Sequence, residues 1–304
     1  PRINNRFTIR MVTSDSSEGS KIGLLGRRGR LGGGLRHRDG LGVLRLLDRL
    51  DLAELQVGLV EQLVDVASIG LGAQLLELVE RDKSVGAGTG TTANHAQDKY
   101  VYHLQYRDRL FLDIVTDWRS GLSILKPFLT DPYYRQLPVD AFNFLLAYYN
   151  ARSSVAALPL HIDNYVPTLG DHPNSMQIVF SLNGQTNANG ATIVVPGSHL
   201  IGKLPDRDMT DLAQDLNCEP GDVIIWDSRL WHGALENKTG ADRWSLVATF
   251  RPWFLKQNFD PVRGMPEKIY AILTEQQKAL CGFLSRPAKN ETEKISLKEG
   301  YEGL

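Results

Sequence analysis

The feature that most restricts the fold of this 304-residue chain is a series of short apolar runs of β type in its second half. Pairs of turn-forming residues separate the runs, such as Asn183-Gly184 and Pro220-Gly221. Many short strands joined by glycine-rich turns are typical of a β-sandwich or a jelly roll. The runs are 142–149, 176–182, 192–195, 223–226 and 244–250. We therefore expect residues 142–254 to form a mainly β core, either a sandwich or a jelly roll.

Other segments have different patterns, which divide the chain around this core. Residues 1–40 are rich in glycine and arginine without helical or strand periodicity, so we expect a flexible arm. Apolar residues recur at helical spacing in 41–135, which predicts a mainly helical part, and again in 264–283, which predicts a C-terminal helix. We expect 41–287 to form a single domain and the polar residues 288–304 to be a loosely held tail.

The apolar spacing also predicts individual elements within the helical part. Residues 41–81 are expected to form two amphipathic helices, broken near Gly70 and Gly72. The glycine- and threonine-rich residues 86–92 are expected to form a loop. A further helix is predicted over 107–118, with its apolar residues on one face.

Composition argues against several classes of partner. The formal net charge of −1 provides no overall field that would attract nucleic acid or acidic lipid. No apolar run reaches the roughly 18 residues that a membrane-spanning helix needs, so we expect no membrane span. The two cysteines, Cys218 and Cys281, are far apart and form no CxxC motif. They suit a reducing compartment, so we expect a cytoplasmic or other reducing intracellular location.

The tripeptide His161-Ile162-Asp163 and the distant His232 are the candidate metal ligands. In an extended chain, residues i and i+2 point to the same face, so His161 and Asp163 can bind one ion from the end of a strand. His232 follows a predicted strand and a short turn, which would bring a third ligand from a neighbouring strand. Two imidazoles and one carboxylate on one face form the facial triad of non-haem iron(II) oxygenases. Taken alone, an HxD tripeptide is more often a polar strand end at the surface.

The residues around His232 strengthen this interpretation. The segment from Pro220 to Gly233 begins with a turn, continues as a predicted buried strand and ends with a histidine followed by a glycine. A glycine beside a ligand allows close approach of the backbone or the substrate. Arg243 lies eleven residues after His232, and Ser245 shares its face of the next strand. A guanidinium there would hold the far carboxylate of a dicarboxylic co-substrate in a fork, with a hydrogen bond from Ser245. The alternative for Arg243 alone is a surface ion pair with Asp242 or Glu236.

Taken together, these motifs resemble the phytanoyl-CoA dioxygenase family of iron(II)/2-oxoglutarate oxygenases. The resemblance covers about 142–254, with weaker support to about Pro287. The matching segments are His161-Ile-Asp163, Asn189-Gly-Ala-Thr-Ile-Val-Val-Pro-Gly-Ser-His199, Pro220-Gly-Asp-Val-Ile-Ile-Trp226 continuing through His232, and Arg243. The combination is far more specific than any one of its parts.

The resemblance implies a double-stranded β-helix, a cupin-like jelly roll with flanking helices. It also implies that His161, Asp163 and His232 bind iron(II) and that Arg243 binds 2-oxoglutarate. Such an enzyme would use O2 to hydroxylate a C–H bond of a small-molecule or lipid-like substrate, with decarboxylation of 2-oxoglutarate to succinate and CO2. Because related halogenases lack the carboxylate that Asp163 supplies, hydroxylation is favoured over halogenation.

Two further residues are candidates for hydrogen bonds to the co-substrate, each with a structural alternative. Gln177 follows the metal motif on a predicted strand, and it is otherwise a polar strand residue. Tyr149 lies on an earlier strand, where an aromatic role in the core or at its rim is the alternative. Two other function classes stay open: a cupin-like metalloenzyme that does not use 2-oxoglutarate, and a non-catalytic jelly-roll binding module.

Overall fold

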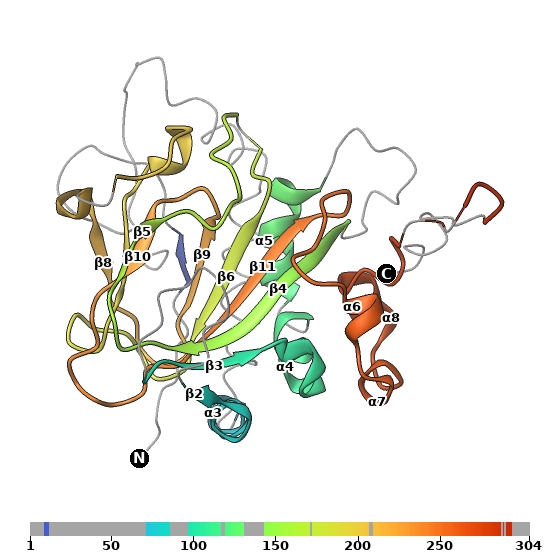
Figure 1. The fold of residues 1–304 in the computed structure, drawn as a ribbon, viewed down its shortest axis with the longest axis horizontal. Helices are drawn as coiled ribbons and strands as arrows, with labels where there is room; N and C mark the ends of the chain where they lie inside the picture. The colour runs from blue at the N-terminus through green and yellow to red at the C-terminus, as the bar shows by residue number, and fades with distance from the viewer. Residues whose placement is uncertain are drawn as a thin grey trace, which may run out of the picture.

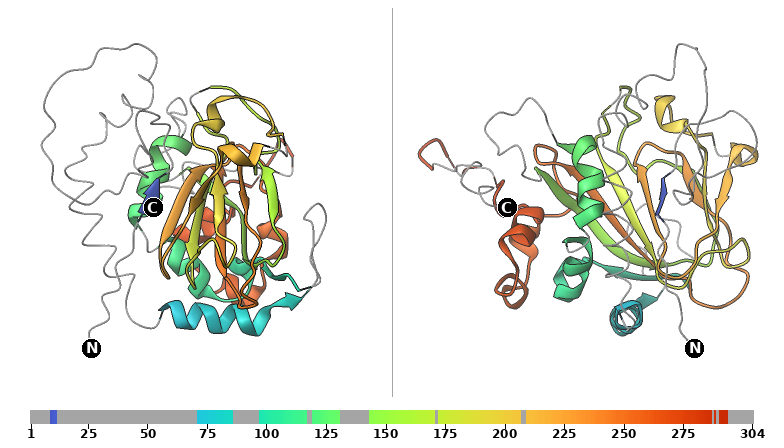
Figure 2. Two further views of the ribbon diagram at one scale, coloured as in Figure 1. Left: turned by 90° about the vertical axis from the view of Figure 1, so that its left-hand side faces the viewer. Right: turned by 180° about the vertical axis from the view of Figure 1, so that it is seen from behind.

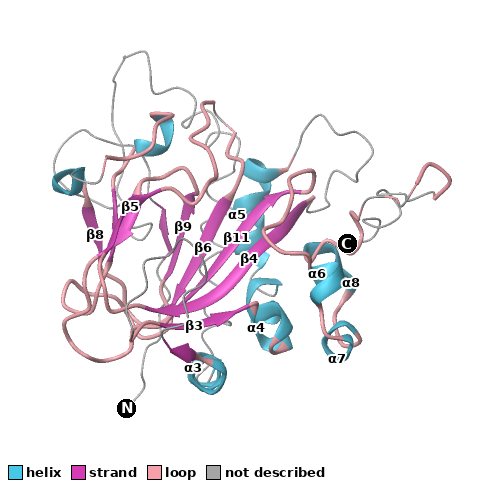
Figure 3. Ribbon diagram, viewed as in Figure 1, coloured by secondary structure: helices cyan, strands magenta, loops and turns pink. Residues whose placement is uncertain are grey.

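Two β-sheets form the centre of the described part of the protein (Figures 1 and 3). The computed structural model describes residues 9–11, 71–85, 97–116, 119–130, 143–170, 172–206, 209–286, 288 and 290–293. A cluster of buried side chains joins the two sheets, with Val179 and Ile224 from one and Val194 and Leu216 from the other. The fold is therefore mainly β, with two facing sheets as in a jelly roll.

The two sheets differ in size, with seven strands in one and four in the other. Across the large sheet the order is β1 (Ile9–Met11), β9 (Val223–Asp227), β6 (Met176–Ser181), β11 (Ser245–Pro252), β4 (Phe144–Ser153), β3 (Lys99–Tyr102) and β2 (Ser84–Val85). Across the small sheet it is β5 (Leu158–His161), β10 (His232–Ala234), β7 (Thr192–Val194) and β8 (Gln214–Leu216). All pairs are antiparallel except β1 with β9. The five runs predicted as strands are all confirmed, as β4, β6, β7, β9 and β11.

Helices cover the outer face of the large sheet, and the right-hand view of Figure 2 shows this side from behind. The α-helices are α3 (Leu71–Asp82), α4 (Arg109–Thr116), α5 (Arg119–Leu129), α6 (Pro261–Gly264), α7 (Glu267–Tyr270) and α8 (Glu275–Leu280). Single 3-10 turns occur as η1 (Leu104–Tyr106), η2 (Ser198–Leu200) and η3 (Met209–Leu212). Among the helices that the structure describes, none combines the length and the apolar character needed to cross a membrane.

The main core lies between these helices and alternate residues of the strands. On β11 the outward residues Leu246, Ala248 and Phe250 are fully buried in this core, together with Phe111 of α4. The residues between them face the smaller sheet, because successive side chains of a strand point to opposite faces. Burying one apolar row under helices thus positions the other row inside the sandwich.

The described residues of the predicted mainly helical part, 41–135, contain helices α3, α4 and α5. Residues 41–135 are not only helical, because β2 and β3 within them extend the large sheet. Helix α3 begins at Leu71, close to the predicted break near Gly70 and Gly72, but Gly72 itself lies inside the helix. The first predicted helix, the loop at 86–92, nearly all of the arm 1–40 and most of the tail lie outside the described residues.

The C-terminal segment 264–283 is not one helix but a series of short ones. Met265 and Pro266 are extended, as expected where a proline disfavours helical backbone in the residue before it. Thr274 then caps α8, accepting a hydrogen bond from the Gln277 backbone while the Gln277 side chain accepts one from the Thr274 backbone. These two signals divide the segment into α6, α7 and α8.

Candidate metal centre

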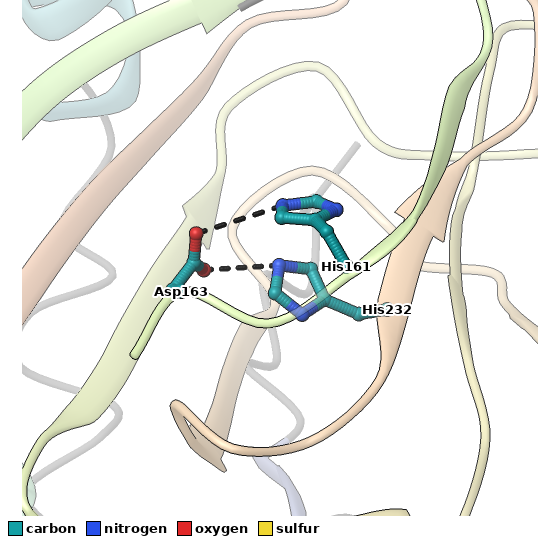
Figure 4. A group of neighbouring side chains, drawn as sticks. All are labelled: His161, Asp163 and His232. Carbon is teal, nitrogen blue, oxygen red and sulfur yellow. Dashed lines mark ion pairs between the residues drawn. The ribbon is translucent and has the colours of Figure 1, made fainter. Parts of the chain in front are cut away.

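The three predicted ligands converge at the end of two paired strands of the small sheet (Figure 4). His161 is the last residue of β5, and His232 is the first residue of β10. The two histidines are direct partners in the β5–β10 register, so their side chains lie on the same face. Asp163 follows β5 by two residues and points back toward both rings. The local i, i+2 spacing and one strand pairing are therefore enough to assemble the cluster.

The candidate ligand atoms lie within 4.8 Å of one another. The Nε2 atom of His232 is 2.9 Å from Oδ2 of Asp163, and the Nε2 atom of His161 is 3.6 Å from Oδ1. The two imidazole rings are 4.2 Å apart between centroids. Two imidazole nitrogens and one carboxylate facing a common point are the donor set of a facial triad.

Both histidines are held in one orientation by backbone carbonyl groups. The Nδ1 atom of His161 is 3.0 Å from the carbonyl oxygen of Pro159, and that of His232 is 2.9 Å from the carbonyl oxygen of Leu230. With Nδ1–H donating to a carbonyl, Nε2 is the ring atom that faces Asp163, and once it has lost its proton its lone pair can bind a metal. The second ring nitrogen of each ligand is thus already occupied in the way that metal-binding histidines require.

The carboxylate of Asp163 is held between the two histidines and the amide of Gln177. The Gln177 Nε2 group, on β6, donates to Oδ2 of Asp163. Burial favours the neutral acid, but the charge of His232 and the hydrogen bonds from both histidines hold the pKa of Asp163 well below its usual range. For His161, burial lowers the pKa, yet the contact with Asp163 more than offsets this and raises it. An ionised carboxylate beside two imidazoles suits a divalent cation.

Gly233 and Arg229 position the strands and the loop that carry the candidate ligands. A Cβ atom at Gly233 would collide with the carbonyl oxygen of Leu158, so this glycine allows β10 to approach β5 beside His232. Arg229, only 4% exposed, pairs with Asp227 at 2.6 Å and donates to the carbonyl oxygen of Gly170 at 2.8 Å. It thereby ties the turn before His232 to the loop after Asp163. We did not single out Arg229 from the sequence, although the Asp-x-Arg spacing after a buried strand was a signal.

Arg243 lies inside the sandwich rather than at the surface. It is 6% exposed, and its Nη1 group donates to Ser245 Oγ at 3.3 Å. Asp242 pairs with Lys99 instead, and among the described residues no carboxylate forms an ion pair with Arg243. Burial, followed by the positive charge of Arg152, lowers the pKa of Arg243 to about 10. The Nε group is buried with no hydrogen-bond acceptor, so the guanidinium is suited to bind an anion.

Gln177 and Tyr149 differ in where the structure places them. Gln177 faces the interior and contacts the metal cluster through Asp163. Tyr149 faces the opposite side of the sheet, where its ring packs edge-to-face on Phe111 with centroids 6.3 Å apart. The prediction that Tyr149 reaches the co-substrate is wrong, because a bulge at Ala147 leaves β4 with one extra residue and changes the phase of its side chains.

The bulge turns Tyr148, rather than Tyr149, toward the interior. Tyr148 is in register with Thr249, which is in register with Gln177, so these three side chains form one row across the inner face. The Asn150 side chain donates to the Tyr148 hydroxyl at 2.8 Å. Burial, with smaller effects of neighbouring charges including Asp163, raises the pKa of Tyr148. Sequence reasoning missed Tyr148 and Asn150 because alternation alone cannot reveal the bulge.

The chain is similar to proteins of bacteria and fungi. It is 35% identical to the uncharacterized protein Rv1501 of Mycobacterium tuberculosis over 119 residues, 38% of this chain and 43% of that protein. It is 29% identical to the dioxygenase cdmA of Talaromyces verruculosus over 119 residues, 38% of this chain and 39% of that one. With the dioxygenase af480 of Aspergillus fumigatus it shares 26% identity over 186 residues, 59% and 57% of the two chains. The chain thus spans about two fifths to three fifths of these relatives' lengths.

Solved structures show a more distant likeness. HygX from Streptomyces hygroscopicus, with nickel, 2-oxoglutarate and hygromycin B bound, has a TM-score of 0.49 at 17% identity, covering 66% of this chain and 88% of that one. The non-haem 2-oxoglutarate-dependent epimerase SnoN has a TM-score of 0.45 at 18% identity, covering 61% and 74%.

The family model of phytanoyl-CoA dioxygenase (PhyH) matches residues 78–245. The match begins within α3, well before the region in which the sequence motifs resemble that family, and it includes both metal-ligand motifs and Arg243. It spans more than half of the chain, and on this ground the protein belongs to the phytanoyl-CoA dioxygenase family.

Proposed function

We propose that the protein is an iron(II)- and 2-oxoglutarate-dependent dioxygenase that hydroxylates a C–H bond of a small-molecule or lipid-like substrate. The observation that supports this most directly is the pairing of two features inside one sandwich. One is the His161–Asp163–His232 cluster, and the other is Arg243, a buried guanidinium without an acidic partner among the described residues. A metal triad alone would fit many metalloenzymes, whereas the added anion site fits a dicarboxylic co-substrate.

The donor set of the cluster fits iron(II). His161, Asp163 and His232 would bind the ion from one side and leave the other side for ligands. Iron bound there would supply, with 2-oxoglutarate and O2 as co-substrates, the oxidising power for C–H hydroxylation, and the co-substrate would leave as succinate and CO2. The presence of the Asp163 carboxylate favours hydroxylation over halogenation, because it occupies the position that a halide would need.

The remaining residues of the site would bind and orient. Arg243, with the Ser245 hydroxyl beside it, would hold the far carboxylate of 2-oxoglutarate. Gln177 would keep the Asp163 carboxylate in place, leaving it turned toward the histidines. Trp226 packs beside His232, with ring centroids 5.2 Å apart, and would exclude water from that side of the centre.

The test is an assay of succinate formation by the purified protein with iron(II), ascorbate, 2-oxoglutarate and a broad substrate panel, with and without O2. We expect O2-dependent succinate in the wild type and its near-complete loss in Arg243→Met, since breaking a buried charge pair costs roughly 2–5 kcal/mol. Arg109→Met is the matched control, because Arg109 is paired with Asp113 on α4 in the outer helix layer. Activity that needs the metal but not 2-oxoglutarate, and survives Arg243→Met, would indicate a cupin-like metalloenzyme instead.

A further inference from the structure

A second arginine lies on the same inner face as Arg243. Arg152 of β4 is the direct register partner of Ser245 on β11, so the two side chains share a face of the large sheet. The Ser245 hydroxyl in turn accepts a hydrogen bond from the Arg243 guanidinium. The strand pairing therefore brings Arg152 to the Arg243 end of the sandwich, although the two arginines are 91 positions apart in the chain.

The charge of Arg152 is not neutralised by an acid in the described part of the chain. Its Nε group donates to the Ser154 hydroxyl, and its guanidinium carbon lies 5.6 Å from the ring centroid of Tyr100. The nearby carboxylates are engaged elsewhere: Asp98 accepts from the Val155 backbone N–H at 2.7 Å, and Asp242 pairs with Lys99. The hydroxyl and the ring hold the guanidinium in place without cancelling its charge.

Two guanidinium groups without acidic partners on one face of a sheet, one buried and one half-buried, repel each other. The positive charge of Arg152 is one of the causes that lower the pKa of Arg243 and oppose the rise in the pKa of His161. Its field thus reaches both the anion site and the metal cluster. Such an arrangement costs stability in the free protein and is relieved when an anion lies between the cations.

We propose that Arg152 is a second cationic residue of the 2-oxoglutarate site and binds the far carboxylate together with Arg243. This rests on the proposed function. A carboxylate has two oxygens with lone pairs in several directions, so it accepts hydrogen bonds from two guanidinium groups at once. The charge of Arg152 should contribute little to the affinity for a 2-oxo acid that has no second carboxylate. Comparing two such acids therefore tests the inference.

The test compares two ligands, 2-oxoglutarate and pyruvate, which share the metal-binding 2-oxo acid but differ in the far carboxylate. Binding of each to the nickel-loaded protein is measured by calorimetry for wild type, Arg152→Met and the outer-layer control Arg109→Met. In Arg152→Met we expect about a 10-fold loss of 2-oxoglutarate affinity, the size of one charge-assisted hydrogen bond, with pyruvate affinity changed less than about twofold. Arg109→Met should leave both affinities at the wild-type values.

Equal 2-oxoglutarate affinity in wild type and Arg152→Met would overturn the inference. If Arg152→Met loses both ligands, its fold is damaged, and Arg152→Gln decides, since it removes the charge but keeps a donor for Ser154. Selective loss of 2-oxoglutarate in Arg152→Gln supports the inference, and retention of both ligands overturns it. Failure of the proposed function has a different signature, because the wild-type protein would then not bind 2-oxoglutarate at all.

Discussion

The two faces of the seven-stranded sheet differ in chemistry, although the same strands supply both. On β11, Leu246 and Phe250 face outward and are buried under the helices, while Ser245 and Thr249 face the smaller sheet. The outer face is apolar and continuous with the helix core. The inner face combines an apolar cluster that includes Val179 and Ile224 with hydroxyl, amide and guanidinium groups, and it lies opposite the candidate metal centre. Alternate residues of one strand thus serve two different purposes.

This division has an energetic reason. A buried guanidinium with no acidic partner, such as Arg243, reduces the stability of the ligand-free fold, because a charge in a low-dielectric interior is poorly solvated. The apolar outer face offsets that cost by removing large side chains such as Phe111 and Phe250 from water. Substitutions on the outer face should therefore change stability first, and those on the inner face should change ligand binding first.

The largest expected effect is at the metal cluster. Asp163→Ala removes the single carboxylate among the three candidate ligands and leaves two imidazoles facing each other. We expect metal affinity to fall by more than about 100-fold, because residues that only hydrogen-bond to metal ligands usually account for 10- to 100-fold. Succinate formation should be undetectable. Calorimetric titration with Ni²⁺ measures the affinity, and thermal unfolding of the metal-free protein checks the fold. Wild-type metal affinity in this variant would remove Asp163 from the centre.

A substitution on the outer face should have the converse effect. Phe250→Ala removes a fully buried ring that packs edge-to-face on Phe144, with centroids 6.0 Å apart. We expect the free energy of unfolding to fall by about 3–5 kcal/mol, while the metal affinity of the folded protein stays near the wild-type value. Urea unfolding and metal titration at low temperature give the two quantities. A selective loss of metal affinity, with stability unchanged, would contradict the division between the faces.

Gln177→Leu tests a residue of the inner face that contacts a candidate metal ligand without being one itself. Leucine has a similar size but cannot donate to Asp163, so the carboxylate loses the hydrogen bond that holds it. We expect metal affinity to fall by about 10- to 100-fold. The loss of this hydrogen bond to Asp163 opposes the gain from removing the partnerless Gln177 Oε1, so the free energy of unfolding should change by less than about 1 kcal/mol. Gln177→Glu is the matched variant, since a second carboxylate would repel Asp163; unchanged metal affinity in both variants would show that Gln177 has no positioning role.

The smallest effect is expected for the neighbouring pair of tyrosines on β4. Tyr149→Phe removes a buried hydroxyl that has no partner, so 2-oxoglutarate affinity should change less than about twofold and the free energy of unfolding should rise by up to about 1 kcal/mol. Tyr148→Phe, on the inner face, removes the hydroxyl that accepts from the Asn150 amide, so its free energy of unfolding should be lower than that of Tyr149→Phe. A larger loss of co-substrate affinity in Tyr149→Phe than in Tyr148→Phe would show that Tyr149, not Tyr148, faces the interior, against the bulge at Ala147.

Local patterns were sufficient where the structure depends on neighbours in sequence. The strand runs were recognisable from apolar residues between turn dipeptides, and the common face of His161 and Asp163 follows from an i, i+2 spacing. The buried position of Arg243 was predicted only by weighing it together with the metal motif, since its spacing alone also fits a surface ion pair. Short strands such as β2 and β3 escaped detection because two to four residues provide too little periodicity.

The sequence by itself thus determined the types of ligand, their spacing and the mainly β character of the second half of the chain. The tertiary structure decided which of two adjacent tyrosines faces the interior, that Gln177 holds Asp163, and that Arg152 lies beside Ser245. The physical reason is that register and bulges depend on pairing between strands distant in the chain, and one extra residue reverses the face of every side chain beyond it.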